Sequence, residues 1–135
     1  MNSKRFFIHI YNPKEDILSE LKVEQIGENE YRATESDLFD CRLTFRTEFE
    51  TEINERGLHK LVKITKASPF ITRRFLLSIE YTNAEYELLG EELVKRGGFW
   101  QVDMGGIATI NIPKDLDLNI DDIMKSLNLY LSEII

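Results

Sequence analysis

The chain has 135 residues, of which 42% are hydrophobic and 30% charged, enough apolar material for one core without metals or disulfides. Its net charge of -7 repels phosphate backbones, which argues against nucleic acid as a direct partner. The single cysteine, Cys41, allows no intrachain disulfide, and no apolar run is long enough to cross a bilayer. We therefore expect one cytoplasmic domain covering residues 1–135, with no membrane association.

The first half of the chain predicts short strands. Residues 6–11, FFIHIY, form one strand that ends at Asn12-Pro13, and residues 21–36 form two more around a turn at 27–29. Residues 43–53, LTFRTEFETEI, alternate with period two and indicate a half-buried strand.

A hairpin is expected to join residues 43–53 to residues 58–66. A loop at 54–57 pairs Ile53 with Leu58 and Phe49 with Val62, so that both faces agree. This register places His59 opposite Glu52 on the solvent face. Gly57 closes the turn, where a positive φ is often required.

The second half predicts a strand at 73–81, facing its core with Phe75, Leu77, Ile79 and Tyr81, followed by a helix to residue 96. Thr82 and Glu85 have the spacing of a capping box, in which side chain and backbone groups bond reciprocally. Gly90 lies on the apolar stripe of this helix. Because a helix-interior glycine costs roughly 1 kcal/mol relative to alanine, we expect close packing against a sheet there.

Two glycine pairs bracket the only tryptophan in the stretch GGFWQVDMGGIATINIP. Gly97-Gly98 is expected to cap the helix with a left-handed residue. A three-residue loop, residues 104–106, pairs Val102 with Ala108 and Trp100 with Ile110, and puts Gly106 in the left-handed position. We interpret both pairs as turn and helix-end residues, because neither of the phosphate-binding glycine motifs, GxGxxG and GxxxxGK(S/T), is present.

Residues 119–135 predict a final amphipathic helix capped by Asn119, with acidic residues in its first turn. The predicted class is α+β: an antiparallel β meander plus a ferredoxin-like β-α-β-β-α unit that lacks its last strand. We expect residues 6–11 to fill that gap by pairing beside residues 73–81 or an adjacent strand.

No group of residues has the spacing of a catalytic, cofactor or metal site, so the predicted sets are empty and no cofactor is expected. His9 and His59 lack metal-ligand partners in sequence. Asp37 and Asp40 would raise the pKa of the Cys41 thiol and make it a poor nucleophile. We interpret Cys41 as a small buried hydrophobe.

Three further groups have structural explanations. The alternating carboxylates are interpreted as the solvated face of a strand rather than as general acid–base pairs: Glu48, Glu50, Glu52 and Glu55. Arg73 and Arg74 point to opposite faces of a strand and cannot form one anion clamp. Aromatic residues at strand and helix spacing could line a ligand pocket but are more often core: Phe75, Tyr81, Tyr86 and Trp100.

The order of these elements resembles the domain-of-unknown-function 4265 family of bacterial proteins. The resemblance covers roughly residues 20–130 and rests on NEYRATESDLF, the strand around TFRTEFETEI, ITRRFLL, a helix ending in glycine, a hairpin ending in NIP and a final helix. The resemblance implies no established activity.

Two classes of function are open. The first is a non-enzymatic protein-interaction module, such as an inhibitor or immunity-type protein, with a basic protein or a second copy of itself as partner. It rests on the negative charge and the lack of a catalytic constellation. The second is a small-ligand-binding regulatory domain, which rests on analogy with ferredoxin-like sheets. An enzyme ranks third.

Overall fold

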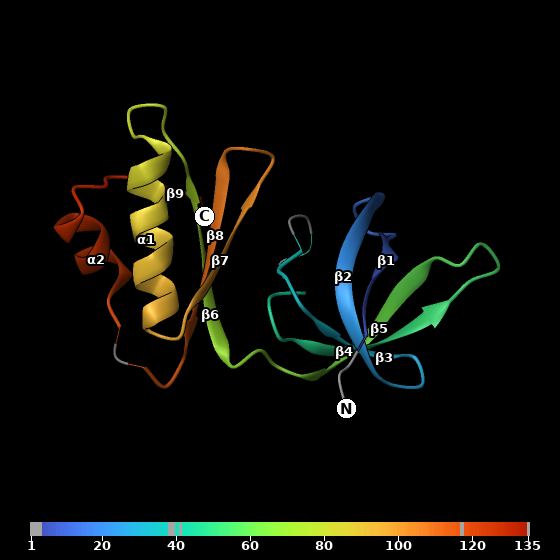
Figure 1. Cartoon of the computed structure of the whole chain (residues 1–135). Helices are drawn as coiled ribbons and strands as arrows, with labels where there is room; N and C mark the ends of the chain where they lie inside the picture. The colour runs from blue at the N-terminus through green and yellow to red at the C-terminus, as the bar shows by residue number, and fades with distance from the viewer. Residues whose placement is uncertain (1–3, 38–39, 41, 117, 135) are drawn as a thin grey trace. The chain divides into compact units, whose positions relative to one another are not determined.

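The computed structural model describes residues 4–37, 40, 42–116 and 118–134. The protein is α+β and divides into two compact units, Met1–Pro69 and Phe70–Ile135 (Figure 1). Each unit has its own hydrophobic cluster. The sequence predicts one domain, whereas the contacts gather around two separate cores. None of the described helices is long and apolar enough to span a membrane.

The first unit is a closed barrel of five strands in the order β1-β2-β3-β4-β5. Neighbouring strands run antiparallel, and one parallel bridge, Ile10 to His59, closes the barrel between β1 and β5. The strands are β1 Arg5–Asn12, β2 Ile17–Gly27, β3 Glu30–Ala33, β4 Glu48–Ile53 and β5 His59–Lys66.

Alternate residues of these strands fill the barrel, as the period of a half-buried strand requires. From β1, the buried side chains are Ile8 and Ile10, with Phe6 partly buried beside them. The other members of the cluster are Leu21, Val23, Tyr31, Ala33, Leu43 and Phe49.

The predicted partner of residues 6–11 is wrong, because β1 pairs with β2 along its whole length and not with residues 73–81. The turn between the two strands explains the hairpin. Asp16 adopts a positive φ of 52°, and its carboxylate accepts a hydrogen bond from the Tyr11 hydroxyl at 2.7 Å. The Asn12 side chain accepts from the backbone N–H of Lys14 at 3.1 Å.

The predicted register of the β4–β5 hairpin is also wrong. The turn includes Leu58, so Ile53 pairs with His59, and two irregularities shift the pairing further until Glu48 meets Lys66. Gly57 has the predicted positive φ, 78°. The shift turns His59 into the barrel, where it is buried, while Ile53 is exposed.

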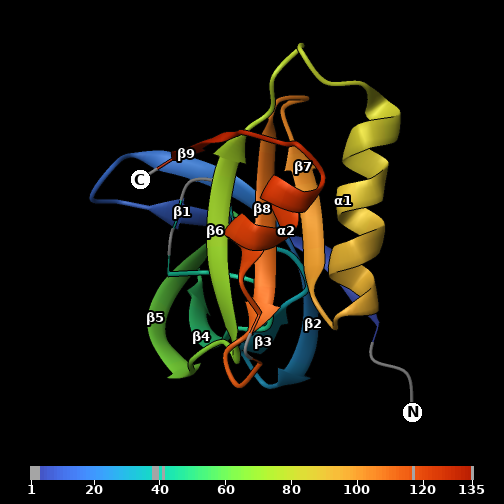
Figure 2. The same ribbon diagram turned by 90° about the vertical axis from the view of Figure 1, so that its left-hand side faces the viewer.

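The second unit is a four-stranded antiparallel sheet, in the order β7-β8-β6-β9, with both helices on one face (Figure 2). Its elements are β6 Phe70–Leu76, α1 Asn83–Lys95, β7 Phe99–Asp103, β8 Ile107–Pro113, α2 Ile120–Ser126 and β9 Ser132–Ile134. Its core lies between the sheet and the helices, with buried Phe75 and Ile110 from the sheet meeting Leu89 and Leu93 of α1 and Ile123 of α2.

Helix α1 has the predicted ends. The Thr82 hydroxyl accepts from the backbone N–H of Glu85 at 3.3 Å, and the Glu85 carboxylate accepts from the backbone N–H of Thr82 at 3.0 Å. At the other end Gly97 has a φ of 86°, and the N–H of Gly98 donates to the carbonyl of Leu93 at 2.8 Å. This is a Schellman motif, and it confirms Gly97 as the helix stop.

Strand β6 begins and ends earlier than predicted. It spans residues 70–76 rather than 73–81, because Ser78 leaves the sheet: its backbone N–H donates to the Tyr86 hydroxyl at 2.7 Å, and that hydroxyl donates to its carbonyl at 2.6 Å. Ile79, expected in the core, is fully exposed.

The hairpin between β7 and β8 has the predicted pairs, Val102 with Ala108 and Trp100 with Ile110. The predicted backbone geometry of its loop is wrong at one position. Positive φ falls on Met104 (53°) and Gly105 (70°) rather than on Gly106. The first two loop residues therefore carry the left-handed conformation.

The last segment differs most from the predicted helix over residues 119–135. Asn119 caps α2 as expected, but the helix stops at Ser126 because Asn128 adopts a φ of 57°. The N–H groups of Asn128 and Leu129 close a second Schellman motif. The chain then adds β9 beside β6, which supplies the strand that the sequence interpretation lacked.

An arginine fastens this short strand. The guanidinium of Arg73 on β6 donates to the carboxylate of Glu133 on β9 at 2.7 and 2.9 Å, and to Asp121 on α2 at 3.2 and 3.3 Å. The bidentate bond to Glu133 raises the pKa of Arg73 and lowers that of Glu133.

Candidate functional site

The candidate site is a groove between α1 and β7 in the second unit. Trp100 on β7 lies directly against Gly90 on α1: a Cβ at Gly90 would fall 2.7 Å from Cε2 of the indole. Because Gly90 has no side chain, the indole ring of Trp100 can pack directly against the backbone of α1. This contact explains the expected close packing at Gly90.

The floor of the groove is apolar. Trp100 packs against the core with one side, and Val94 beside it is 62% exposed. The space is about 510 Å³, and its lining is Glu87, Gly90, Glu91, Val94, Lys95 and Trp100.

The rim of the groove carries exposed charges. Two pairs of opposite charge are spaced i,i+4 on α1. Glu92 and Arg96 form an ion pair at 2.9 Å, whereas Glu91 and Lys95 are not bonded to each other. Among the described residues, neither Glu87 nor Glu91 has an ion pair, so two solvated carboxylates stand beside the apolar floor. The arrangement can hold an apolar side chain flanked by cationic ones.

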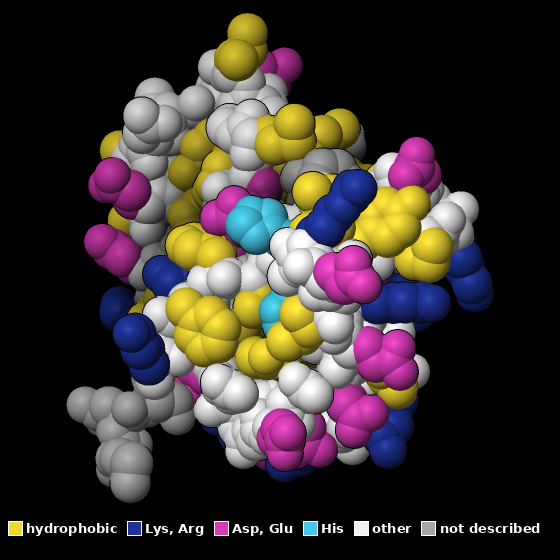
Figure 3. Space-filling model, turned by 90° about the vertical axis from the view of Figure 1, so that its right-hand side faces the viewer, with side chains coloured by type: hydrophobic (Ala, Val, Ile, Leu, Met, Phe, Trp, Pro, Cys, Tyr) yellow, Lys and Arg dark blue, Asp and Glu magenta, His cyan; other side chains and the backbone are white. Residues whose placement is uncertain are grey.

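His59 occupies a different environment from the predicted surface pair with Glu52. Its Nδ1 lies 2.7 Å from the Thr51 hydroxyl, and its ring packs edge-on against Tyr31 with centroids 5.3 Å apart. Burial lowers its pKa, with a smaller contribution from the charge of His9. Figure 3 shows a face of the molecule on which histidine side chains, in cyan, lie among hydrophobic and acidic ones.

Among the described residues, no accessible nucleophile lies at His59. The Nε2 atom of His59 has no hydrogen-bond partner among the described residues. Because every fully buried side-chain N or O atom of those residues has a partner, Nε2 is in contact with solvent. Thr51 is buried, and its hydroxyl bonds to Nδ1 of His59 and so fixes the orientation of the imidazole ring. His9 is exposed and lies 3.5 Å from Glu20, and among residues with described positions no three potential ligands gather around a metal-sized space.

The other candidates fall where structural roles explain them. Glu48 accepts from Arg32, which also lies 3.7 Å from Glu24, so this carboxylate is part of a charge network. Arg73 binds Glu133 and Asp121, whereas Nε of Arg74 donates to the Thr109 hydroxyl on the opposite face at 3.3 Å. Phe75 and Tyr86 are core residues, with Tyr81 packed against them. Cys41 lies outside the described residues.

The sequence interpretation singled out Gly90 and Trp100 separately and did not bring them together. A usable signal existed: a helix-interior glycine precedes the only tryptophan, which stands at the second position of the next strand. A ring that large beside a missing side chain indicates a contact between the two elements.

No family model and no curated protein matches the chain. The fold is similar to that of a hypothetical protein from Neisseria gonorrhoeae known from a crystal structure, with a TM-score of 0.61 and 16% identity over 99% of this chain and 94% of the other. At that identity the likeness establishes the fold alone. The resemblance to the domain-of-unknown-function 4265 family stays a prediction.

Proposed function

We propose that the protein is a non-enzymatic interaction module whose α1–β7 groove binds a basic partner segment with an apolar anchor residue. The observation that supports this function is the exposed apolar floor made by Trp100 and Val94 beside Glu87 and Glu91. A tryptophan set in a groove is the kind of residue that dominates binding energy at interfaces.

Charge favours a basic segment over an acidic or neutral one. Lys or Arg residues that flank the anchor can pair with Glu87 and Glu91 at the rim. Residues 70–135 contain 6 Lys and Arg against 11 Asp and Glu, a net charge of -5, so the unit also attracts a cationic partner from a distance.

Catalysis is disfavoured by the same groups. The titratable residues of the groove, Glu87, Glu91 and Lys95, are exposed to water. General acid–base catalysis depends on groups whose pKa values are tuned by burial or by close neighbours.

A selection experiment tests the proposed function. Random peptides displayed on phage are selected on the full chain, and binding of the enriched peptides is followed by the fluorescence of Trp100. We expect sequences with one large apolar residue flanked by Lys or Arg. Val94→Lys should weaken their binding by about tenfold, equivalent to roughly 1.4 kcal/mol, through steric and charge repulsion.

Leu88→Lys is the matched control. Leu88 is 53% exposed on the same helix but does not line the groove, so this variant adds the same charge and should leave binding unchanged. Enrichment of acidic peptides, or equal binding by both variants, would contradict the proposal.

A ferredoxin-like assignment of the second unit is part of the proposal. Its chain order, β-α-β-β-α-β, and its sheet order, β7-β8-β6-β9, support it. Sheets of this type also serve in small-ligand-binding regulatory domains, which keeps that function as the second candidate. A thermal-shift screen with metabolites tests it, because a ligand raises the melting temperature of the form it binds.

A further inference from the structure

Strand β7 lies at the edge of its sheet. In the order β7-β8-β6-β9 it pairs with β8 alone, from Phe99 opposite Asn111 to Asp103 opposite Ile107. Figure 2 shows it as the last strand on the side of α1, and none of the described strands pairs with its other side. Such an edge presents a row of backbone N–H and C=O groups that can pair with a further strand.

The α1–β7 groove runs along this free edge. Trp100 is the second residue of β7, and the other residues that line the groove belong to α1. Because side chains alternate between the faces of a sheet, every second residue of a segment paired with β7 faces α1, as Trp100 does. A residue opposite Trp100 has its Cβ about 4.5–5.5 Å from that of the tryptophan. Its side chain therefore enters the groove beside Gly90 and Val94.

We propose that the basic partner segment binds at this edge as an added strand, with its apolar anchor opposite Trp100. This inference rests on the proposed function of the groove and specifies the conformation and the sequence pattern of the partner. Main-chain hydrogen bonds to β7 provide affinity, and the groove selects the side chain at the anchor position.

The spacing of the acidic residues on α1 specifies where the basic residues of the partner stand. Glu87 and Glu91 line the groove one helical turn apart, about 6 Å along the axis. Residues i and i+2 of a strand face the same side and are about 7 Å apart. A Lys or Arg two positions from the anchor therefore reaches one of these carboxylates. A helical partner would need the same charge three or four positions away.

Charge favours a cationic segment over a second copy of the chain at this edge. Residues 70–135 contain 6 Lys and Arg against 11 Asp and Glu, so two copies joined edge to edge would each bring a net charge of -5. A basic segment instead brings opposite charge to Glu87 and Glu91, neither of which has an ion pair within the described part of the chain.

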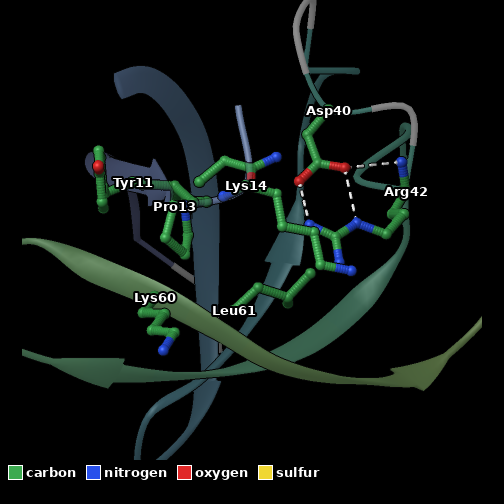
Figure 4. Close-up of a pocket in the computed structure, with 9 residues that line it drawn as sticks. Tyr11, Pro13, Lys14, Asp40, Arg42, Lys60 and Leu61 are labelled. Atoms are coloured by element: carbon green, nitrogen blue, oxygen red, sulfur yellow. Dashed lines mark hydrogen bonds and ion pairs between the residues drawn. The ribbon is translucent and has the colours of Figure 1, made fainter. Parts of the chain in front are cut away.

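The barrel unit has no equivalent position for a peptide strand. Closure pairs its first strand with its last, and a closed barrel has no outermost strand like β7. The small pocket of this unit, about 120 Å³ in volume, does not gather its charges either. Figure 4 shows Lys60 pointing away from Lys14 and from the ion pair of Asp40 with Arg42. The added strand is therefore assigned to the second unit.

Hydrogen exchange of the ¹⁵N-labelled full chain tests the added strand. The probe is the end-blocked peptide Thr-Lys-Thr-Leu-Thr-Lys-Thr, whose two lysines share a face with the leucine when the peptide is extended. At a peptide concentration of about ten times its dissociation constant, we expect alternate backbone amides of residues 99–103 to exchange about tenfold more slowly. The amides of residues 132–134 in β9, at the other edge of the sheet, should be unchanged.

Three matched peptides separate strand pairing from general attraction. Thr-Thr-Lys-Leu-Lys-Thr-Thr has the same composition but directs its lysines to the face opposite the leucine, and it should bind about threefold more weakly or worse. Two further copies of the probe each carry one N-methyl group, on the leucine or on the threonine that follows it. Adjacent N–H groups of a strand point to opposite sides, so one of these peptides should lose about tenfold in affinity and the other should keep it.

The outcomes distinguish the added strand from the groove itself. Binding that Val94→Lys weakens, but without slower exchange in β7 or with equal affinity for the two N-methylated peptides, overturns the added strand and leaves the groove as a binding site. Slower exchange in β7 that grows with protein concentration in the absence of peptide assigns the edge to a second copy and also overturns the inference. A peptide selection that enriches no basic sequence overturns the proposed function as well.

Discussion

The two units have similar hydrophobic clusters but bury different numbers of polar side chains. Both clusters are built from aliphatic and aromatic residues. Of the ten polar side chains that are buried among the described residues, eight lie in the barrel unit, among them Thr51 and His59, which bond to each other. Five of the eight lie outside the barrel strands: Ser36, Asp37, Asp40, Thr47 and Ser68. The connecting segments of the barrel unit therefore bury polar groups, which need hydrogen-bond partners there.

Charge separates the units as well. The barrel unit has 11 Lys and Arg against 13 Asp and Glu, a net charge of -2, compared with -5 for residues 70–135. The proposed groove for a basic segment lies in the more acidic unit. A basic segment thus has the charge that residues 70–135 attract.

The largest expected losses of stability come from replacing one large buried side chain in one unit at a time. Phe49 and Phe75 are fully buried in the two clusters, and replacing either by alanine should cost about 3–5 kcal/mol. Trp100, the only tryptophan, reports the second unit by fluorescence, while circular dichroism reports both. Phe75→Ala should lower the fluorescence midpoint, and Phe49→Ala should lower only the dichroism midpoint of a separate transition.

A single coincident transition in both variants would show that the two cores unfold as one, and the contrast between the units would then describe packing rather than cooperativity.

Gly90→Ala should have the next largest effect. A methyl group there collides with the indole of Trp100, and such overpacking typically costs about 1–3 kcal/mol. We expect a lower urea midpoint and a changed Trp100 emission maximum. Leu88→Ala, on the exposed side of the same helix, is the control and should change neither.

The β7–β8 loop should distinguish its two glycines by about 1 kcal/mol. Gly105 has a positive φ and Gly106 does not, so alanine is strained at the first position alone. Urea unfolding of Gly105→Ala and Gly106→Ala provides the measurement. A greater loss for Gly106→Ala would restore the loop geometry that the sequence suggested.

The smallest expected effect is a pH dependence confined to the barrel. Burial lowers the pKa of His59 below 6.5, so the unfolded chain takes up this proton first as the pH falls. As the pH falls from about 6.5 to the pKa of His59 in the folded chain, the free energy of unfolding should therefore decrease. Above about pH 6.5 the histidine is neutral in both states and should add no pH dependence to the free energy of unfolding. Residues 70–135 contain no histidine, so their Trp100 transition serves as the internal control.

An NMR titration of His59 with a midpoint at or above 6.5 would remove the basis for this difference between the units.

Local signals predicted the second unit better than the barrel. The capping box at Thr82, the helix stop at Gly97 and the pairing of Trp100 with Ile110 all depend on residues close in sequence, and the structure has each of them. The end of α2 was missed although Asn128 is a residue type that tolerates positive φ. The apolar residues after Asn128 continue the helical period, so the sequence pattern did not indicate that the helix ends there.

The barrel could not be derived in this way. Its closing bridge joins Ile10 to His59, and no local pattern specifies a pairing between residues so far apart. A one-residue longer turn was enough to move His59 from the expected surface to the interior, because side chains alternate between faces. The groove was missed for a similar reason: Gly90 and Trp100 meet across two elements.

The single bridge between β1 and β5 also bears on how fast the chain reaches its native state. Its partners are 49 positions apart, so the closing contact forms only after a long segment has been ordered. Folds dominated by such distant pairings pass their barriers more slowly than those with local contacts. During synthesis, β1 can pair with β2 early, but its second neighbour, β5, becomes available only after residues 59–66 have left the ribosome.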